Sequence, residues 1–289
     1  MAKEESTRAA SRKTRVYVFR EFLLSNDMYG DYLKEGDIIL DAAGGKGDFS
    51  WLMCNVDGFD SVVIDPRVTK NHIEKSVAYL RSHPDEAQKR SIPNLLTYQP
   101  LATLIPKLEG KQEFQSPNHL RILMDEELIS AVRRRRTMMQ KSENDKDKGR
   151  EEWETYWKAA ILKGRLAQTL GYEEKETTPN QVDDSEKAFE KLLQAKLIVG
   201  FHPDQSTDFC IELANELGIP FCIVPCCVFP SEFPDRKLAD GSRVRDYSQL
   251  IEYLKLKEPT VKMAKLPFNF TETAKNLALY TLPSKATML

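Results

Sequence analysis

The sequence has 289 residues, of which 42 are lysine or arginine and 44 are aspartate or glutamate, so the formal net charge at pH 7 is −2. This balance excludes a protein that coats nucleic acid with a uniformly basic surface, although a local basic patch is compatible with it. Hydrophobic residues make up 41% of the chain, enough for a sizeable core, and no apolar run approaches the ~18 residues of a membrane span.

The chain has five cysteines, an odd number that does not suit a disulfide framework. They are Cys54, Cys210, Cys222, Cys226 and Cys227. We therefore expect a reducing, intracellular compartment, with the cytoplasm as the first choice and a mitochondrial or nuclear location left open. The N-terminus lacks the apolar centre of a secretory signal.

The start of the chain is basic. Its first 20 residues hold six lysines and arginines against Glu4 and Glu5. This pattern fits a solvated arm, an organelle transit peptide or a nucleic-acid contact, and the early glutamates disfavour the transit peptide. We expect 1–14 to form a flexible basic arm ahead of one domain that spans 15–289.

Short apolar segments alternate with helical patterns along much of the chain. The expected strands are 37–41, 61–65, 94–98, 196–201 and 219–225, and the expected helices between them are 48–54, 69–82 and 206–217. Strands without internal polar residues are typical of a parallel sheet covered on both faces, and their alternation with helices predicts a doubly wound, Rossmann-like α/β domain. Two further strands at 260–266 and 274–281, joined by a short link, predict an antiparallel hairpin at the C-terminal end.

The range 104–195 differs in composition, and we expect it to be a largely helical, charged insertion. Acidic and basic residues alternate closely at 141–154, which predicts a mobile segment near 141–150. Trp153 and Trp157 then begin a helical pattern, and their spacing favours core packing or a partner surface over a platform for bases.

Four consecutive arginines, Arg133, Arg134, Arg135 and Arg136, lie in this insertion. They are compatible with a phosphate patch that contacts RNA or a ribonucleoprotein together with the N-terminal arm, or with a solvated helix face. Single-stranded nucleic acid is usually bound with aromatic stacking partners, and no aromatic residue lies within this run.

The strongest motif is Asp41-Ala-Ala-Gly44-Gly45-Lys-Gly47-Asp48, at a predicted strand-to-helix junction. Glycines allow a tight turn that brings a ligand close to the main chain, and the helix that follows offers unpaired N–H groups. Asp65 ends the next strand, where an acid can accept hydrogen bonds from two ribose hydroxyls. This pairing predicts an adenosine-type cofactor across the ends of two adjacent strands.

Two cofactor types fit such a site, and the residues favour one of them. A dinucleotide site requires a third glycine where this chain has Ser50, and Asp48 would place a negative charge near the phosphates. S-adenosylmethionine (SAM) has no phosphate and carries a sulfonium cation, so acidic residues suit it. A glycine-rich turn without any cofactor is the remaining alternative.

The sequence Gly200-Phe-His202-Pro-Asp204-Gln-Ser-Thr207-Asp208 follows a predicted strand directly and therefore projects at the same edge. His202 is a candidate base, orienting donor or ligand, with a purely structural histidine as the alternative. Asp204 is placed to orient His202 or a substrate hydroxyl. Thr207 and Asp208 fit the simpler roles of helix cap and first-turn acid.

Pro225-Cys226-Cys227 follows the next strand. Adjacent cysteines do not have the usual zinc-ligand spacing, so the sequence predicts no metal site, although His202 and both thiols would supply three soft ligands. A reactive thiol and simple packing at the rim of the pocket are the other interpretations.

The acid-glycine motif from Asp41 to Gly47 resembles motif I of class I SAM-dependent methyltransferases. The loop His-Pro-x-x-x-Thr-Asp and the Pro-Cys-Cys sequence resemble one branch of that superfamily, which includes tRNA 2′-O-methyltransferases and other methyltransferase-like proteins. The resemblance covers about residues 15–100 and 195–285, and implies a methyltransferase sheet and SAM as cofactor.

The resemblance also implies roles for individual residues. The cofactor is expected to be framed by Asp41, Gly44, Gly45, Gly47 and Asp65, with Pro100 and Leu101 near the adenine. His202 and Asp204 are expected to face the methyl acceptor, an RNA or a protein. The alternative is a catalytically weak or inactive assembly factor on the same fold, within a larger protein or ribonucleoprotein complex.

Overall fold

The computed structural model describes residues 15–69, 72–82, 107–108, 110–111, 113–168, 180–267 and 275–283. Several sequence predictions lie outside these ranges: the flexible arm at 1–14, the strand at 94–98, and the adenine-side residues Pro100 and Leu101.

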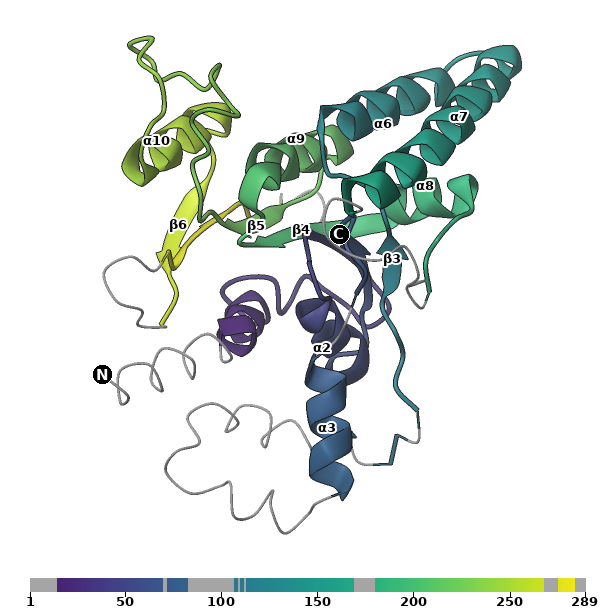
Figure 1. Ribbon diagram of the computed structural model, residues 1–289, viewed down its shortest axis with the longest axis vertical. Helices are drawn as coiled ribbons and strands as arrows, with labels where there is room; N and C mark the ends of the chain where they lie inside the picture. Colours follow the sequence, from purple (N-terminus) through teal and green to yellow (C-terminus); the bar gives the residue numbers. More distant parts are fainter. Residues whose placement is uncertain are drawn as a thin grey trace.

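The centre of the molecule is a seven-stranded sheet with the strand order β3-β2-β1-β4-β5-β7-β6 (Figure 1). Its strands are β1 (Ile38–Ala42), β2 (Asp60–Ile64), β3 (Asn118–Leu120), β4 (Ala195–Phe201), β5 (Phe221–Val224), β6 (Lys262–Lys265) and β7 (Leu277–Tyr280). The first five are parallel, whereas β7 runs antiparallel to both β5 and β6. The prediction of a mostly parallel Rossmann-like sheet with a C-terminal antiparallel hairpin is therefore confirmed.

Helices cover both faces of this sheet. They are α2 (Asp48–Val56), α3 (His72–Ser82), α6 (Glu126–Met139), α7 (Glu143–Gln168), α8 (Ser185–Gln194), α9 (Thr207–Leu217) and α10 (Tyr247–Lys257). In Figure 1, α6 to α9 lie above the sheet and α2 and α3 lie below it. No helix among the described residues is long and apolar enough to cross a membrane.

The two-sided covering explains why the central strands are apolar throughout. Leu40 of β1 packs in the core shared with α6 to α9, whereas its neighbour Ile39 packs with the segment 15–33 and with α2. Successive side chains of a strand point to opposite faces, so a strand buried on both faces needs apolar residues at every position. Tyr29 ties the 15–33 segment to the sheet, since its hydroxyl lies 2.9 Å from the Phe221 carbonyl oxygen.

The range 104–195 supplies a strand as well as helices. β3 pairs with β2 at one edge of the sheet, so the helical insertion proper runs from α6 to α8, between β3 and β4. β3 has only three residues, Asn-His-Leu, and this short polar segment lacks the apolar run by which the other parallel strands were predicted.

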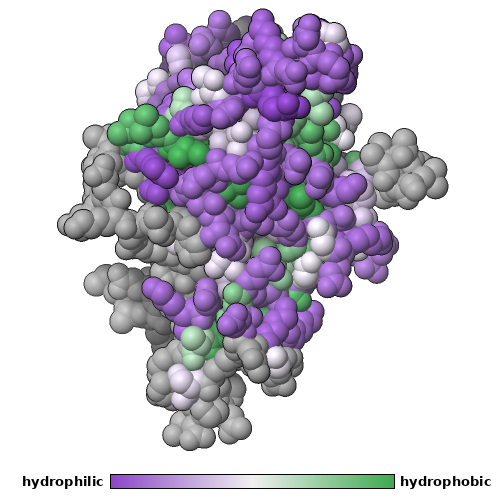
Figure 2. Space-filling view, turned by 90° about the vertical axis from the view of Figure 1, so that its right-hand side faces the viewer, coloured by the Kyte–Doolittle hydropathy of each residue, from purple (hydrophilic) through white to green (hydrophobic). Residues whose placement is uncertain are grey.

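The prediction of a mobile charged segment near 141–150 is wrong, because α7 is one helix from Glu143 to Gln168. Its charges pair at helical spacing, with Lys146 bound to Glu143 at 2.5 Å and Lys158 bound to Glu154 at 2.6 Å. Such pairs support a helix with few apolar residues in its first turns. Figure 2 shows the face that lies on the right in Figure 1, and its surface is mostly hydrophilic.

The glycines of α7 allow close packing rather than breaking the helix. A Cβ atom on Gly149 would lie 2.9 Å from the Cβ of Met138 in α6, and one on Gly164 would lie 2.5 Å from the Arg121 carbonyl oxygen. Trp153 and Trp157 are buried beside α8, and their indole N–H groups donate to backbone carbonyls at 2.7 and 3.0 Å. The aromatic pair is therefore core.

Candidate functional site

The candidate site lies at the carboxyl edge of the sheet, around β1 and β4. The chain progresses outward from β1 through β2 to β3, and in the other direction from β4 to β5, so β1 and β4 flank the point where the strand order reverses. Open α/β sheets bind ligands in the crevice outside the carboxyl ends at such a point. The glycine loop and the segments after β2, β4 and β5 all begin at this edge.

The glycine loop connects β1 to α2 through backbone conformations that favour glycine. Gly45 and Gly47 have φ angles of 57° and 77°, and Ala43 has a φ of 53° although it is not glycine. Gly44 is required for a different reason, since a Cβ atom there would lie 2.5 Å from Asp41 Oδ2. The loop is thus folded directly over the first acid.

Asp41 is held beneath this loop by Ser50. Its side chain is buried, and the Ser50 hydroxyl donates to Oδ2 at 2.8 Å while accepting from Ser61 at 2.9 Å. Burial, reinforced by the charges of Asp65 and Asp48, raises the pKa of Asp41 to about 7, and the Ser50 hydrogen bond opposes this. Ser50 occupies the place where a dinucleotide motif has its third glycine, and here it anchors the acid.

Asp65, the second acid, is buried at the end of β2 and fully engaged. Oδ2 accepts from the Gly45 N–H and from Arg67 Nη2, both at 2.9 Å. Oδ1 accepts from the Arg67 backbone N–H at 2.8 Å and from Arg67 Nε at 3.0 Å. A carboxylate has about four lone-pair positions, so these donors saturate it.

Arg67 is the site residue that sequence reasoning did not predict. Its side chain is 59% exposed, and Nη2 lies 3.2 Å from where a Cβ atom of Gly45 would be. Hydrogen bonding to Asp65 raises its pKa, and the charge of Asp204 contributes in the same direction. The guanidinium therefore reaches from the end of β2 across the glycine loop toward the loop after β4.

His202 follows β4 in a left-handed conformation, with a φ of 59°. Its Nε2 atom lies 3.4 Å from Arg15 Nη1, which can only donate, so this ring nitrogen accepts and the imidazole is neutral. Burial and the charge of Arg15 lower the pKa of His202 to about 4. At neutral pH such a histidine accepts a hydrogen bond and is a weak base.

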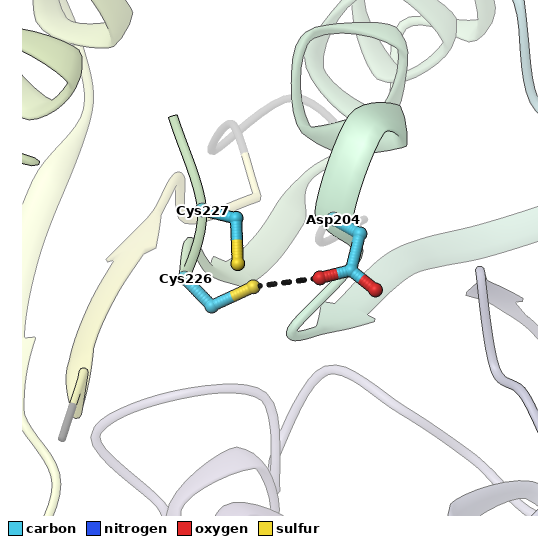
Figure 3. Close-up of side chains that lie close together, drawn as sticks. All are labelled: Asp204, Cys226 and Cys227. Carbon is cyan, nitrogen blue, oxygen red and sulfur yellow. Dashed lines mark hydrogen bonds between the residues drawn. The ribbon is translucent and has the colours of Figure 1, made fainter. Parts of the chain in front are cut away.

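Asp204 also has a left-handed backbone, with a φ of 46°, and it lies beside the cysteine pair. The Cys226 thiol donates to Asp204 Oδ1 at 3.0 Å (Figure 3). Two left-handed non-glycine residues in one short loop are a kind of strain that concentrates at functional sites. The structure therefore groups the two thiols with Asp204 rather than with His202.

Thr207 and Asp208 do not cap α9 with their side chains. The residue before the helix is Ser206, whose side chain makes no capping hydrogen bond, and the Thr207 hydroxyl donates to the Asp204 carbonyl oxygen at 2.8 Å. Asp208 lies in the first turn as predicted, but its carboxylate is buried and accepts from Arg236 Nε at 3.1 Å. Asp208 thus fixes the chain that follows the cysteine pair.

The four arginines of α6 are surrounded by glutamates. Arg133 and Arg136 both bind Glu216 at 2.9 Å, and Arg135 is buried against the Phe189 ring and pairs with Glu186. The remaining arginine, Arg134, lines an open groove of about 970 Å³ between α6 and α7, together with Glu126, Glu127, Glu151 and Glu152. Within the described residues, the run presents mixed charge.

His119 is a second residue that sequence reasoning missed. It is buried on β3, and its Nε2 atom lies 2.7 Å from the Asp65 carbonyl oxygen, so Nε2 carries the proton. Burial lowers its pKa. A neutral histidine here supports the backbone that presents Asp65. The sequence offered no signal for it, because β3 itself was not predicted.

Comparison of the chain with protein-family models, with curated proteins and with solved structures gave no match.

Proposed function

We propose that the protein is a SAM-dependent methyltransferase that binds its cofactor at the carboxyl edge of β1 and β2. One observation carries this proposal: two buried acids, Asp41 near the end of β1 and Asp65 after the neighbouring β2, both contact the glycine loop at the carboxyl edge of the sheet. Asp65 is placed to hold the ribose, and Gly44, Gly45 and Gly47 leave room for the rest of the cofactor. The antiparallel β7 is what the methyltransferase resemblance implies.

The charges of the site favour SAM over a dinucleotide. Asp41 and Asp65 are close enough for their charges to interact, and Asp48 adds a third negative charge. Arg67 offsets the charge of Asp65, so Asp41 and Asp48 decide the sign of the site. A phosphate beside them would be repelled, whereas a cationic ligand would be attracted and would favour the ionised form of Asp41. Ser50 also packs beneath the loop, where close dinucleotide packing would need glycine.

The acceptor side is assigned to the loop after β4. SAM supplies an already activated methyl group, so the protein's main task is to align the acceptor. Asp204 can accept a hydrogen bond from an acceptor N–H or O–H. Neutral His202 has one accepting nitrogen, Nε2, which faces Arg15, so it accepts from the methyl acceptor if that group replaces Arg15. RNA and protein both offer such groups. Contact with RNA through Arg133–Arg136 would require these arginines to exchange their glutamate partners for phosphates.

Calorimetric titration tests the cofactor assignment. SAM and its demethylated product should bind at a 1:1 ratio, whereas NAD should not bind. Asp65→Asn should abolish binding, because an amide cannot accept hydrogen bonds from both ribose hydroxyls and the N–H groups at once. Asp240→Asn, at an exposed carboxylate that accepts hydrogen bonds from Ser242, is the matched control. Equal SAM affinity in wild type and Asp65→Asn would overturn the site.

A second candidate function is that of an assembly factor on the methyltransferase fold. The saturated Asp65 favours it, because Arg67 supplies from within the chain the donors that ribose would supply. In that case neither the wild type nor Arg67→Ala binds SAM. Binding by either protein would exclude a factor that has lost its cofactor site.

A further inference from the structure

We infer that Asp204, Cys226 and Cys227 form a binding site for one thiophilic divalent cation of the zinc type. Their ligand atoms, one carboxylate oxygen and two sulfurs, all lie within 4.8 Å of one another. Figure 3 shows both sulfurs directed toward the space in front of the carboxylate. Among the described residues, this is the group of three such side chains close enough to share an ion. The inference does not depend on methyl transfer.

Neighbouring parallel strands bring the three ligands together. Phe201 of β4 is paired with Val224 of β5, and Asp204 follows three residues after the former while Cys226 follows two residues after the latter. The His202 N–H donates to the Val224 carbonyl oxygen at 3.1 Å, so the pairing continues into the loops. The sheet thus sets the separation of the ligands.

The loop conformations aim the side chains. The left-handed φ of 46° at Asp204, after Pro203, is unfavourable for a non-glycine residue and needs a compensating contact. In the structure that contact is the hydrogen bond from Cys226 to Asp204. A bound cation would replace the thiol proton between these two atoms.

The ligand set matches the preferences of zinc. Thiolates and a carboxylate both bind Zn²⁺, and three protein ligands leave the fourth tetrahedral position to water or another molecule. Ligand atoms around zinc with ~2.3 Å bonds to sulfur lie about 3.7 Å apart, so small side-chain rotations close the group. Cys227 and Asp204 are exposed, which gives an ion access from solvent.

The state without a cation is consistent with this role. The Cys226 thiol donates its hydrogen to Asp204, so a cation that binds both residues displaces this proton. The Tyr247 hydroxyl is buried without a hydrogen-bond partner among the described residues, and burial, followed by the neighbouring Cys226, raises its pKa to about 12. A polar atom without a partner therefore lies near the cluster.

Metal uptake by the reduced full-length chain tests the inference. After removal of metals with a chelator, dialysis against zinc should load one equivalent per chain, measured by elemental analysis. Cobalt should give the intense near-ultraviolet absorption of thiolate-to-cobalt charge transfer and the visible bands of a tetrahedral site. Zinc should also raise the thermal unfolding temperature, because it binds the folded state.

Variants assign the ligands. Cys226→Ser and Cys227→Ser should each weaken zinc binding by about 100-fold or more, and Asp204→Asn by about tenfold. Two variants serve as controls. Cys54→Ser replaces a thiol in α2, and Glu232→Gln replaces an exposed carboxylate in the loop between β5 and α10, so both should bind zinc as the wild type does. If a cysteine variant does not fold, Asp204→Asn still decides the question, since its side chain is at the surface.

Three outcomes would overturn the inference. The first is that the reduced protein takes up no zinc and shows no cobalt charge-transfer band. The second is that metal binding is unchanged in Asp204→Asn and in the cysteine variants. The third is a mass spectrum that shows a Cys226–Cys227 disulfide in the isolated chain, with no metal uptake after reduction. Loss of SAM binding has no bearing on any of these, so failure of the two proposals is distinguishable.

Discussion

Arg67 and Asp65 form a two-pronged ion pair in which Nε and Nη2 donate to the two carboxylate oxygens at 3.0 and 2.9 Å. The acid assigned to the ribose is therefore closed by a side chain from its own strand end. Because Arg67 is more than half exposed, the pair is partly screened, and its displacement costs little. Under the proposed function, the ribose of the cofactor would bind Asp65 by replacing the hydrogen-bond donors of Arg67.

Arg67→Ala should raise SAM affinity by roughly two- to fivefold, because an exposed ion pair contributes up to about 1 kcal/mol and the cofactor no longer has to displace it. Calorimetry of the variant measures the change. Arg67→Lys keeps the charge without the planar guanidinium, so its SAM affinity should lie between those of the wild type and Arg67→Ala. A fall in affinity in Arg67→Ala would show instead that the guanidinium holds the cofactor.

Asp41→Asn should change stability in a pH-dependent way. The pKa of Asp41 is raised from 3.8 to about 7, so the folded state binds this proton more tightly than the unfolded state does. The contribution of Asp41 to stability is therefore full below about pH 4, falls as the pH rises from 4 to 7, and stays at its lowest above 7. The side-chain amide in Asp41→Asn does not ionise, so the variant does not lose stability in this way as the pH rises.

Urea unfolding at pH 5 and pH 8 measures the difference. Between pH 5 and pH 8 the stability of Asp41→Asn relative to the wild type should rise by roughly 1–3 kcal/mol, less than the ~4 kcal/mol of three full pKa units, because part of the loss has already occurred at pH 5. Ser50→Ala removes the hydrogen bond that favours the carboxylate, so it should enlarge the pH dependence. A gap between Asp41→Asn and wild type that is the same at both pH values would contradict this origin.

Arg15→Gln should raise the pKa of His202 above its value of about 4. Burial is the larger cause of that low value and Arg15 the second, so the pKa should rise but stay below 6.5. Titration of the histidine ring protons by NMR measures it. Lys196→Gln, at the opposite end of β4, is a matched loss of one cation and should leave the pKa unchanged. An unmoved pKa in Arg15→Gln would assign the whole effect to burial.

Gly44→Ala should disturb the site through a steric clash rather than through backbone strain. The new Cβ would lie 2.5 Å from Asp41 Oδ2, so the acid or the loop must shift. We expect a loss of roughly 1–3 kcal/mol in the free energy of unfolding and weaker SAM binding. Gly36→Ala is the control, because its φ of 85° costs about 1–2 kcal/mol while nothing lies within 4 Å, and SAM affinity should not change. Equal SAM affinity in both variants would refute the clash.

The sequence predicts the fold where local pattern determines it. The parallel strands β1, β2, β4 and β5 are continuous apolar runs, and these predictions are confirmed to within one or two residues. β3 escaped prediction because an edge strand of three residues needs no apolar run. The first turns of α7 were mistaken for a mobile segment because their charges stabilise a helix only when paired, as Lys146 is with Glu143.

The sequence predicts the position of a site residue only where that residue lies in a loop directly after a predicted strand. The positions of Asp41 and Asp65 follow from the strand ends, since parallel strands share one carboxyl edge. The partners of the site residues depend on three-dimensional proximity: Arg15 reaches His202 from the other end of the chain, and Asp204 meets Cys226 across two strands. No spacing rule connects these pairs.

Arg236→Ala should destabilise the protein strongly. Arg236 and Asp208 are both buried, Nε donates to the carboxylate at 3.1 Å, and Nη1 donates to the Val228 carbonyl oxygen at 2.7 Å, directly after the cysteine pair. After the change, Asp208 keeps the Tyr253 hydroxyl at 3.1 Å and Lys257 Nζ at 3.8 Å. The cost should therefore lie below the ~3–5 kcal/mol of a buried charge that has lost every partner. Urea unfolding measures this, and the double variant with Asp208→Ala should cost less than the sum of the two single changes. Because Val228 is then no longer held, Arg236→Ala should also weaken zinc uptake, and unchanged uptake would show that the cysteine loop keeps its shape without this anchor.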